Sequence, residues 1–387
     1  MISIEEALKI VNEQDIERTV KEVSLEDAQG FWLAEEITSP FDLPSFDNSA
    51  MDGYAVSGIS DEYEIVGEIP AGSTADHTLQ PGEAMRIFTG AKVPQNTTAV
   101  VMQEKTSVED NTLYVDEAIS KGQHIRPRGK ELALDQTVFT AGHFISPATV
   151  GLIGSLGKSR VQVYKKPEIR IISTGDELVP PGSPKSEGEI YESNSFALSA
   201  ALDRYGFSCE ESKHIKDNFS AIKGGIADFL DHSDVLLLSG GISVGDYDYV
   251  KQALEENGVS ELFYKVFQKP GKPLYFGRRD DTFVFALPGN PASSLTCFYI
   301  HVLPLLQKLS GAANTGLQRV RIPIDHNYDY RSDRPVFLKA SIEGQTVSIL
   351  NRQSSSMIHS MAMGNALAFL DGPQTVQKGD MVECIVI

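Results

Sequence analysis

The first 165 residues combine a short amphipathic start with a long strand-like region. From about residue 20 to 165, short apolar runs alternate with Gly and Pro, which is typical of β-strands joined by turns. The segment 147–157 differs, because its apolar spacing favours a helix. Residues 1–20 gather apolar side chains on one face and predict an amphipathic helix. Those side chains are Ile2, Ala7, Leu8, Ile10 and Val11.

From residue 166 the pattern changes to alternating strands and helices. Continuous apolar runs of strand length occur at 168–173, 234–241 and 282–290, and a helical segment follows each of them. This alternation is typical of a parallel sheet that is covered by helices. The helices are expected at 193–206, 248–258 and 291–311.

After Gly311 the chain returns to short apolar runs, which predict a small all-β domain of about 75 residues. The whole pattern therefore predicts a multi-domain protein of α/β plus β class. A run of 18 apolar residues does not occur, so we expect no membrane-spanning helix and a cytoplasmic protein.

Charge and metal-ligand spacing exclude several classes of function. The chain has 34 Lys and Arg against 53 Asp and Glu, a net charge of −19, which argues against a non-specific nucleic-acid binder. A local cluster of lysines and backbone N–H groups can still bind an anion. The cysteines are few and widely spaced and the histidines are scattered, so a zinc site or a disulfide framework is not expected.

Loops follow the three predicted strands at the edge where doubly wound sheets bind ligands. The first, 173–177, contains Gly175 and two acids that suit Mg²⁺ beside a phosphorylated ligand, although a polar turn explains it equally. The second, 239–248, offers glycines and serines as an anion cradle, with Asp246 and Asp248 as metal ligands. A tight turn explains one of its glycines but not all.

Two further segments carry candidate chemistry. In the loop 287–293, Asn290 and Pro291 suit a helix start, which leaves Pro288-Gly289 unexplained. Lysines separated by Pro-Gly in 265–273 resemble an anion clamp, although a solvated basic turn has the same pattern. The usual nucleotide loops and the G-x-S-x-G elbow are absent from the sequence.

Several motifs together resemble the molybdopterin molybdenumtransferases, the MoeA and gephyrin E-domain family. The motifs are SPFDLPSFDNSAMDGYAV, EAMRIFTGAKVP, STGDEL, LLLSGGISVGDYDYV, KPGKPLYFG and LPGNPAS, in family order from about residue 39 to 294. The resemblance implies that adenylylated molybdopterin and molybdate are the substrates, that AMP is released and that Mg²⁺ is used. It also implies a homodimer and transient contact with the adenylyltransferase, without nucleic acid or membrane as partners.

The resemblance further implies a three-layer α/β/α molybdopterin-binding domain, mostly β N-terminal domains and a small C-terminal β-barrel-like domain. The first expected domain is discontinuous and comprises residues 1–52 and 136–165, with a second domain inserted at 53–135. The α/β/α domain is expected at 166–311 and the last domain at 312–387.

Site residues follow from the resemblance motif by motif. Catalytic roles are implied for Asp52, Thr89, Glu131, Glu177, Asp217, Asp248, Lys265 and Lys269, and metal binding for Glu177, Asp246 and Asp248. Binding of the pterin substrate is implied for Thr174, Gly175, Ser239, Gly240, Gly241, Ser243, Gly245, Lys272, Pro288, Gly289, Asn290, Pro291 and Ser356.

The chain departs from the family pattern at two places. Lys130-Glu131 stands where many relatives have Glu-Asp, and the basic partner of Ser356 is either Lys339 or Arg352. Two other functions remain open at this point: a non-catalytic molybdopterin carrier or scaffold, and the molybdopterin adenylyltransferase of the preceding step.

Overall fold

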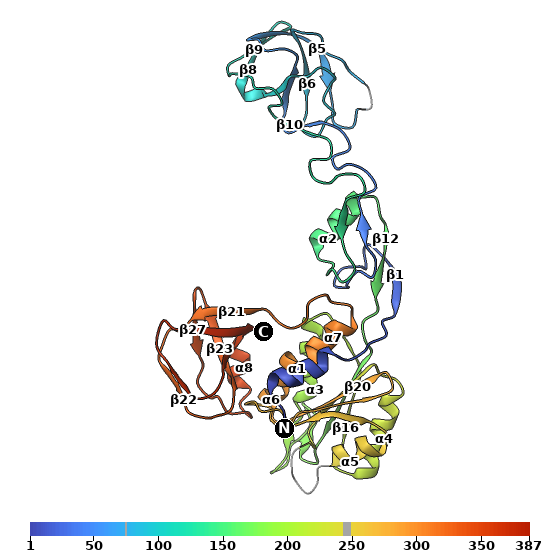
Figure 1. The fold of residues 1–387 in the computed structure, drawn as a ribbon, viewed down its shortest axis with the longest axis vertical. Coiled ribbons are helices and arrows are strands. Elements are labelled where there is room, and N and C mark those ends of the chain that lie inside the picture. Colours follow the sequence, from blue (N-terminus) through green and yellow to red (C-terminus); the bar gives the residue numbers. More distant parts are fainter. Residues whose placement is uncertain (74–75, 243–248) are drawn as a thin grey trace. The chain divides into compact units, whose positions relative to one another are not determined.

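The computed structural model describes residues 1–73, 76–242 and 249–387. It divides into two compact units (Figure 1). The first comprises Met1–Ala34, Ala141–Ser146 and Val161–Ile387, and the second Glu35–Thr140 and Pro147–Arg160. Within the described ranges, no helix is both long enough and apolar enough to cross a membrane. The four-domain division expected from the sequence stays a prediction.

A six-stranded sheet is the centre of the first unit, in the order β16-β13-β17-β20-β19-β18. The first four strands are parallel, as the strand–helix alternation predicts. The last two run antiparallel, so the all-parallel prediction is wrong at this edge. A short turn can join antiparallel strands without a crossover helix, and here Asp280 and Asp281 connect β19 to β20. The strands are β13 (Ile169–Thr174), β16 (Cys209–Ile215), β17 (Val235–Ser239), β18 (Ser260–Tyr264), β19 (Tyr275–Arg279) and β20 (Thr282–Leu287).

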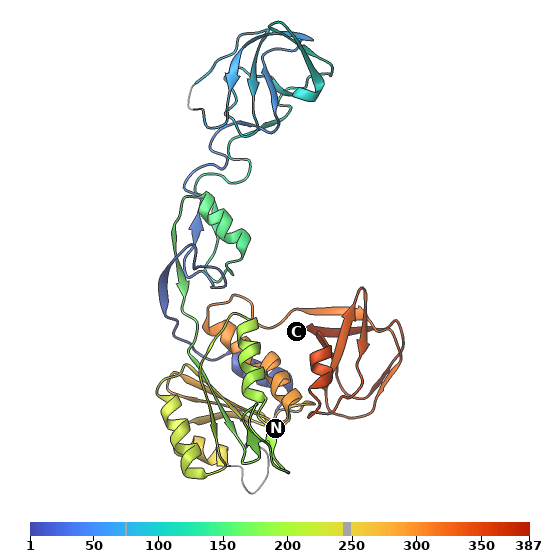
Figure 2. The ribbon, with the colours of Figure 1, turned by 180° about the vertical axis from the view of Figure 1, so that it is seen from behind.

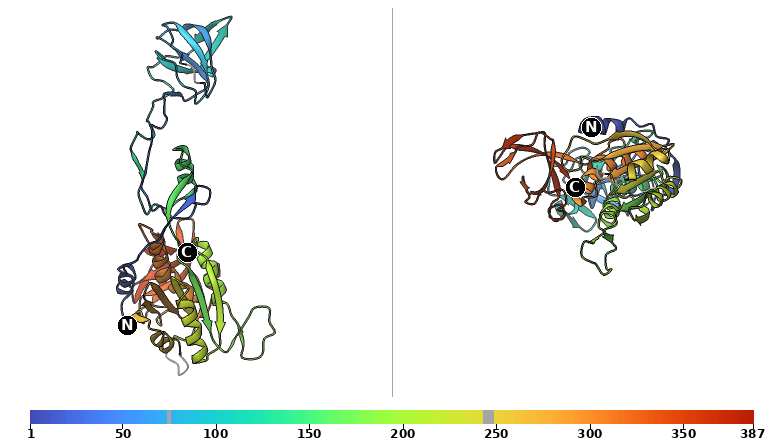
Figure 3. Two further views of the ribbon diagram at one scale, coloured as in Figure 1. Left: turned by 90° about the vertical axis from the view of Figure 1, so that its right-hand side faces the viewer. Right: turned by 90° about the horizontal axis from the view of Figure 1, so that it is seen from below.

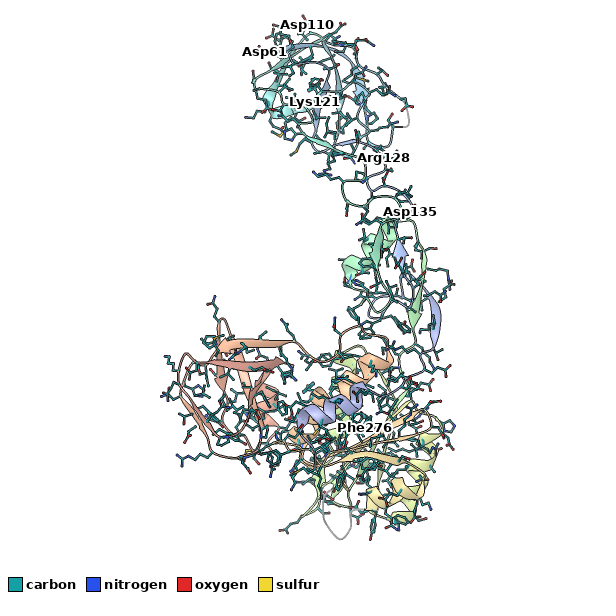
Figure 4. All side chains as sticks on the ribbon, in the orientation of Figure 1. Asp61, Asp110, Lys121, Arg128, Asp135 and Phe276 are labelled. Atoms are coloured by element: carbon teal, nitrogen blue, oxygen red, sulfur yellow. The ribbon has the colours of Figure 1, made fainter. Side chains whose placement is uncertain are left out.

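Helices cover both faces of this sheet, which makes three layers (Figures 1 and 2). On β17, Leu237 packs with one helical layer, whereas Leu236 and Leu238 pack with the other, as alternation along a strand requires. Phe276, labelled in Figure 4, is buried in the first core and stacks 4.5 Å from Phe285. The first layer holds α1 (Ile4–Asn12), α3 (Asn194–Arg204), α6 (Pro291–Cys297) and α7 (Leu303–Leu309), and the second holds α4 (Phe219–Leu230) and α5 (Tyr249–Glu256).

The N-terminal helix is confirmed, although it ends at Asn12. Its cap is the Ser3 hydroxyl, which accepts from the backbone N–H of Glu6. Short strands complete this part of the unit: β1 (Val20–Ser24) pairs with β12 (Arg160–Tyr164), and β14 (Leu178–Val179) pairs with β15 (Ile190–Tyr191). The green segment between β14 and β15 projects from the α/β layers in Figure 3.

The C-terminal part of the first unit is a curled antiparallel sheet with its own core. Its five strands lie in the order β21-β27-β25-β23-β24, beside a two-stranded β22-β26 pair. The expectation of a small β region after Gly311 is therefore confirmed, but the region is not all-β, because it contains the short helix α8. The elements are β21 (Arg319–Pro323), β22 (Tyr328–Tyr330), β23 (Val336–Glu343), β24 (Thr346–Ile349), α8 (His359–Met363), β25 (Ala366–Leu370), β26 (Gln374–Val376) and β27 (Met381–Val386).

The second unit is mostly β, as predicted. Its six-stranded sheet has the order β7-β4-β6-β5-β9-β8, with apolar clusters on both faces. Strands pack closely at Gly53, where a Cβ atom would lie 1.9 Å from the Val101 carbonyl oxygen. The elements are β2 (Ile37–Thr38), β3 (Asn48–Ser49), β4 (Gly53–Val56), β5 (Glu62–Ile69), β6 (Glu83–Ile87), β7 (Ala99–Met102), η1 (Gln103–Lys105), β8 (Thr106–Glu109), β9 (Thr112–Val115), β10 (Ile125–Arg126), β11 (Thr137–Phe139) and α2 (Pro147–Ser155).

Candidate active site

A cavity of about 610 Å³ lies where three parallel strands of the first unit end. Thr174 is the last residue of β13, Ser239 is the last of β17, and Pro288-Gly289 follow β20. We call this the glycine cavity. Predicted site residues that line it are Thr174, Gly175, Glu177, Asp217, Ser239, Gly240, Gly241, Pro288, Gly289, Asn290, Pro291 and Ser356.

Two glycines bring the backbone against Thr174 at the floor of the glycine cavity. Gly240 and Gly241 have φ of +96° and +61°, a region that side chains disfavour. A Cβ atom on Gly240 would lie 2.5 Å from the Thr174 carbonyl oxygen, and one on Gly241 would lie 2.9 Å from the Thr174 hydroxyl oxygen. Both glycines are therefore required by the close approach of this loop.

Two buried polar atoms in the lining have no hydrogen-bond partner within the described part of the chain. They are the Thr174 hydroxyl oxygen Oγ1 and the Asn194 amide oxygen Oδ1. The other end of the Asn194 amide donates to Ser239 Oγ at 2.8 Å and to the Gly289 carbonyl at 2.7 Å. Asn194 thus ties two strand-end loops together. A buried polar group without a partner is costly, so these atoms mark places where a ligand would bind.

Carboxylates line the same cavity. Glu177 and Asp217 were predicted to do so, and the backbone N–H of Asp217 donates to Asp176 Oδ1 at 3.1 Å. Glu192 was not predicted; it is 6% exposed and accepts from the backbone N–H of Ser195 at 2.9 Å. Among the described residues, no His or Cys lines the cavity, so its anionic donors are oxygens, which suit Mg²⁺.

Part of the predicted site cannot be placed. Ser243, Gly245, Asp246 and Asp248 lie outside the described residues. Within the residues that are described, no group of three or more His, Cys, Asp or Glu side chains is arranged to hold a metal ion.

A second cavity of about 550 Å³ adjoins the first, since Pro273, Pro288 and Asn290 line both. We call it the lysine cavity. Lys269 and Lys272 contribute to it, as the anion-clamp interpretation predicts. Lys265 lines neither cavity and its Nζ lies 4.5 Å from the centre of the Tyr264 ring.

Arg334 is the third cation of the lysine cavity and was not predicted. Its Nε is buried and has no partner among the residues described here, and its guanidinium lies 6.0 Å from the Phe267 ring centre. The residue precedes β23 without any glycine or motif beside it. The signal that could have identified it is only the rarity of cations in an acidic chain.

The C-terminal sheet is joined to the lysine cavity by hydrogen bonds. The Lys269 N–H donates to the Pro335 carbonyl and the Phe337 N–H donates to the Lys269 carbonyl, both at 2.8 Å. Asn290 is the N-cap residue of α6, as predicted, but its side chain makes no capping hydrogen bond and donates to Ser355 Oγ at 3.1 Å. These contacts place Arg334 and Ser355 in the site.

Lys339 and Arg352, the two basic candidates near Ser356, line neither cavity. Lys339 is 3% exposed, and its ammonium donates to the carbonyls of Arg352, Ser354 and Met357 at 2.7, 2.9 and 3.0 Å. Burial lowers the pKa of Lys339. Its position indicates that it holds the serine loop 352–357, whereas Arg352 is exposed.

The remaining predicted residues belong to the second unit. Asp52 Oδ1 accepts from both the backbone N–H and the hydroxyl of Thr89 at 2.7 Å. These hydrogen bonds lower the pKa of Asp52. Arg86 donates to the Gly53 carbonyl at 3.0 Å and stacks on Tyr54. Glu131 is exposed to solvent.

Comparison with known proteins identifies the family. A family model described as the MoeA N-terminal region, domains I and II, matches residues 2–157, and one described as a probable molybdopterin binding domain matches residues 170–308. The molybdopterin molybdenumtransferase of Nostoc sp. is 35% identical over 381 residues, covering 93% of this chain and 87% of that protein. The one from Haemophilus influenzae is 35% identical over 318 residues, covering 80% and 78%.

A solved structure agrees with this match over the full length. The crystal structure of a molybdopterin biosynthesis MoeA protein from Pyrococcus horikoshii OT3 is 27% identical and superposes with a TM-score of 0.85, covering 100% of both chains. The sequence motifs, the fold and the lining of the two cavities all agree with this family. The chain therefore belongs to the molybdopterin molybdenumtransferase family, which acts in molybdenum cofactor biosynthesis.

Proposed function

We propose that this molybdenumtransferase binds adenylylated molybdopterin in the glycine cavity and molybdate in the lysine cavity, and transfers molybdenum between them. The observation that carries the proposal is the shared wall: Pro273, Pro288 and Asn290 line both cavities. Two anionic substrates would thus meet at one place, each beside side chains suited to it.

The lysine cavity has the chemistry for a tetrahedral dianion. Lys269, Lys272 and Arg334 supply positive charge, and Ser354 and Ser355 supply hydroxyl groups. Cations are scarce in this chain, so three in one cavity favour an anion as its ligand. The described residues that line the two cavities include no cysteine, which fits a substrate that brings its own dithiolene sulfurs to the metal.

The glycine cavity suits a phosphorylated pterin. Backbone N–H groups of a glycine loop bind phosphate oxygens without a side chain in the way. Asn194 Oδ1 and Thr174 Oγ1 are free to bind the polar edge of a heterocycle, since no described residue satisfies them. In the proposed reaction, an oxygen of water or of molybdate attacks the adenylyl phosphorus, and the bond from that phosphorus to the bridging oxygen breaks. AMP leaves with the attacking oxygen, and the pterin keeps its own phosphate. The two dithiolene sulfurs bind molybdenum in place of two oxygens of molybdate, which leave in AMP or as water.

Magnesium would bind beside the phosphoanhydride. Glu177 lines the cavity, and the sequence motif offers Asp246 and Asp248 as the other ligands. The ion would polarise the phosphoanhydride and neutralise charge on the leaving phosphate. The homodimer, the cytoplasmic location, transient contact with the adenylyltransferase and the catalytic roles of Asp52, Thr89, Glu131 and Lys265 stay predictions.

The experiment is an AMP-release assay with adenylylated molybdopterin, with and without molybdate. We expect AMP only when molybdate is present. A carrier would bind the substrate without releasing AMP, and an adenylyltransferase would consume ATP.

In the same assay, Lys269→Ala is expected to raise the KM for molybdate by about 10-fold or more, because a charge-assisted contact is lost. The control Lys378→Ala, at an exposed position, should stay within about twofold. Equal effects of the two substitutions would contradict the assignment.

A further inference from the structure

The long helix after β20 contains one turn that is not α-helical. Between α6 and α7, residues Phe298–Val302 form the π-helical turn η2, in which the Leu303 N–H donates to the Phe298 carbonyl. Pro304 follows it and lacks the N–H needed to continue regular pairing. Such π turns are rare and are frequent at functional sites. The side chains that this turn buries are Phe298, Ile300, His301 and Val302, of which His301 is polar.

His301 is fully buried among apolar residues, and its protonation state follows from its partner. Its Nε2 lies 2.8 Å from Gln268 Oε1. The Gln268 amide is oriented by its nitrogen, which faces the Pro270 and Gly271 carbonyls at 3.2 and 3.4 Å. The amide oxygen can only accept, so Nε2 carries the hydrogen. Nδ1 has no partner among the described residues, so a second hydrogen there would leave an unpaired buried charge. The ring is neutral.

Gln268 transmits this contact to the lysine loop, residues 268–272. Its side chain is fully buried, and its amide nitrogen holds both carbonyls at the tip of the loop. Gly271 is packed so tightly there that a Cβ atom would lie 2.3 Å from Cys297 Sγ. The loop thus rests on the helix that carries His301, while its outer side chains, Lys269 and Lys272, line the lysine cavity.

We propose that His301 is a positioning residue: as a neutral hydrogen-bond donor it fixes the Gln268 amide, which holds the loop that presents Lys269 and Lys272 to molybdate. His301 itself lines neither cavity and contacts no substrate in this arrangement. The inference rests on the proposed function for its ligand, since it needs molybdate to bind in the lysine cavity. The relay is the chain of contacts from the His301 imidazole to the Gln268 amide and on to the carbonyls of the loop. These contacts are present in the protein whichever ligand the lysine cavity binds.

The first test compares KM for molybdate with kcat in three variants. His301→Phe keeps the ring size but cannot donate, and we expect the KM for molybdate to rise about 10-fold while kcat and the KM for adenylylated molybdopterin stay within about threefold. His301→Gln can donate again and should recover most of the loss. The matched control is Thr296→Val, a fully buried residue of the same helix whose hydroxyl donates only to the Ala292 carbonyl. An unchanged KM in His301→Phe, or no recovery in His301→Gln, would overturn the proposal.

The second test needs no substrate and separates this inference from the proposed function. Hydrogen exchange of the backbone amides of 268–272 is measured in the wild type, His301→Phe and Thr296→Val. We expect exchange in this loop to accelerate at least about 10-fold in His301→Phe alone. If it accelerates while Lys269→Ala leaves the KM for molybdate unchanged, the relay stands and the molybdate assignment fails. If it does not accelerate, the relay is refuted. Should His301→Phe not fold, Gln268→Leu removes the same contacts and is expected to give the same acceleration.

Discussion

At the scale of single residues, the site depends on groups whose role only the fold reveals. Thr174 Oγ1, Asn194 Oδ1 and Arg334 Nε are polar atoms left without a described partner in the cavity walls. Sequence reasoning could identify Thr174, because a glycine follows it at a strand end. It missed Asn194 and Arg334, because a residue within a helix or before a strand has no local signal of what it will face.

Gly240 allows a direct test of the close-packed glycine loop. In Gly240→Ala, the new Cβ would lie 2.5 Å from the Thr174 carbonyl oxygen at a φ of +96°. We expect a loss of roughly 1–3 kcal/mol of stability and weaker pterin binding. Gly224→Ala is the control, since no atom lies within 4 Å of its Cβ in α4, and it should stabilise by roughly 0.5–1 kcal/mol. Thermal unfolding measures the stability of both variants, and titration with adenylylated molybdopterin measures their binding. A Gly240→Ala variant that behaves like the control would contradict the close approach.

His301 predicts a pH dependence of stability. Burial lowers its pKa from 6.5 to about 3. Between these values the unfolded chain holds a proton that the folded chain does not, so the free energy of unfolding increases with pH in this window. The slope is at most about 1.4 kcal/mol per pH unit. We expect the urea midpoint of the α/β domain to fall from pH 7 to pH 5, and to fall less in His301→Gln. Gln268, the side chain hydrogen-bonded to the ring, does not titrate. If the urea midpoint of His301→Gln fell with pH as much as that of the wild type, the assignment of this pH dependence to His301 would be wrong.

At the scale of elements, the C-terminal sheet contributes to the site through Arg334, which precedes β23, and through the loop 352–357, which Lys339 holds. Lys339 on β23 donates to three carbonyls of the loop 352–357, which carries Ser355 and Ser356. In Lys339→Met these carbonyls lose the ammonium as a donor, although the Arg352 carbonyl keeps the Ser360 hydroxyl and the Ser354 carbonyl keeps the Met357 N–H. We expect a loss of roughly 2–4 kcal/mol together with weaker binding of both substrates.

The control for this prediction is Arg352→Met, because Arg352 is exposed and directs its side chain at neither cavity. It should change stability by no more than about 0.5 kcal/mol. Urea unfolding measures the free energy of unfolding of both variants. If Arg352→Met proved the more damaging change, Arg352 would be the basic site residue and Lys339 would not be the clamp.

The elements themselves were predicted where apolar runs are long. The runs at 168–173, 234–241 and 282–290 became β13, β17 and β20, since buried central strands are apolar throughout. The edge strand β16 was missed because it has no apolar run: its central residues, 210–214, are all polar. Helix α4 was missed because Gly224-Gly225 interrupts it. Gly225 is explained only by packing, as its Cβ would lie 2.2 Å from Ile215 Cδ1 of β16.

At the scale of the whole molecule, the first unit assembles the proposed binding site for anions inside an acidic chain. The sequence predicted the glycine loops and the lysines separately, and their placement at one edge followed from the carboxyl ends of parallel strands. It did not predict that a strand of the C-terminal sheet would bond to the Lys269 backbone and bring Arg334 beside it. That contact joins segments more than 60 residues apart in the sequence, and no local pattern encodes it.

The most direct test of the central claim is an anomalous difference map from crystals soaked in molybdate, recorded near the molybdenum absorption edge. The account predicts its strongest peak in the lysine cavity, within about 4 Å of Lys269 Nζ and the Arg334 guanidinium, as charge-assisted hydrogen bonds require. A strongest peak anywhere else, with the lysine cavity empty, would contradict it.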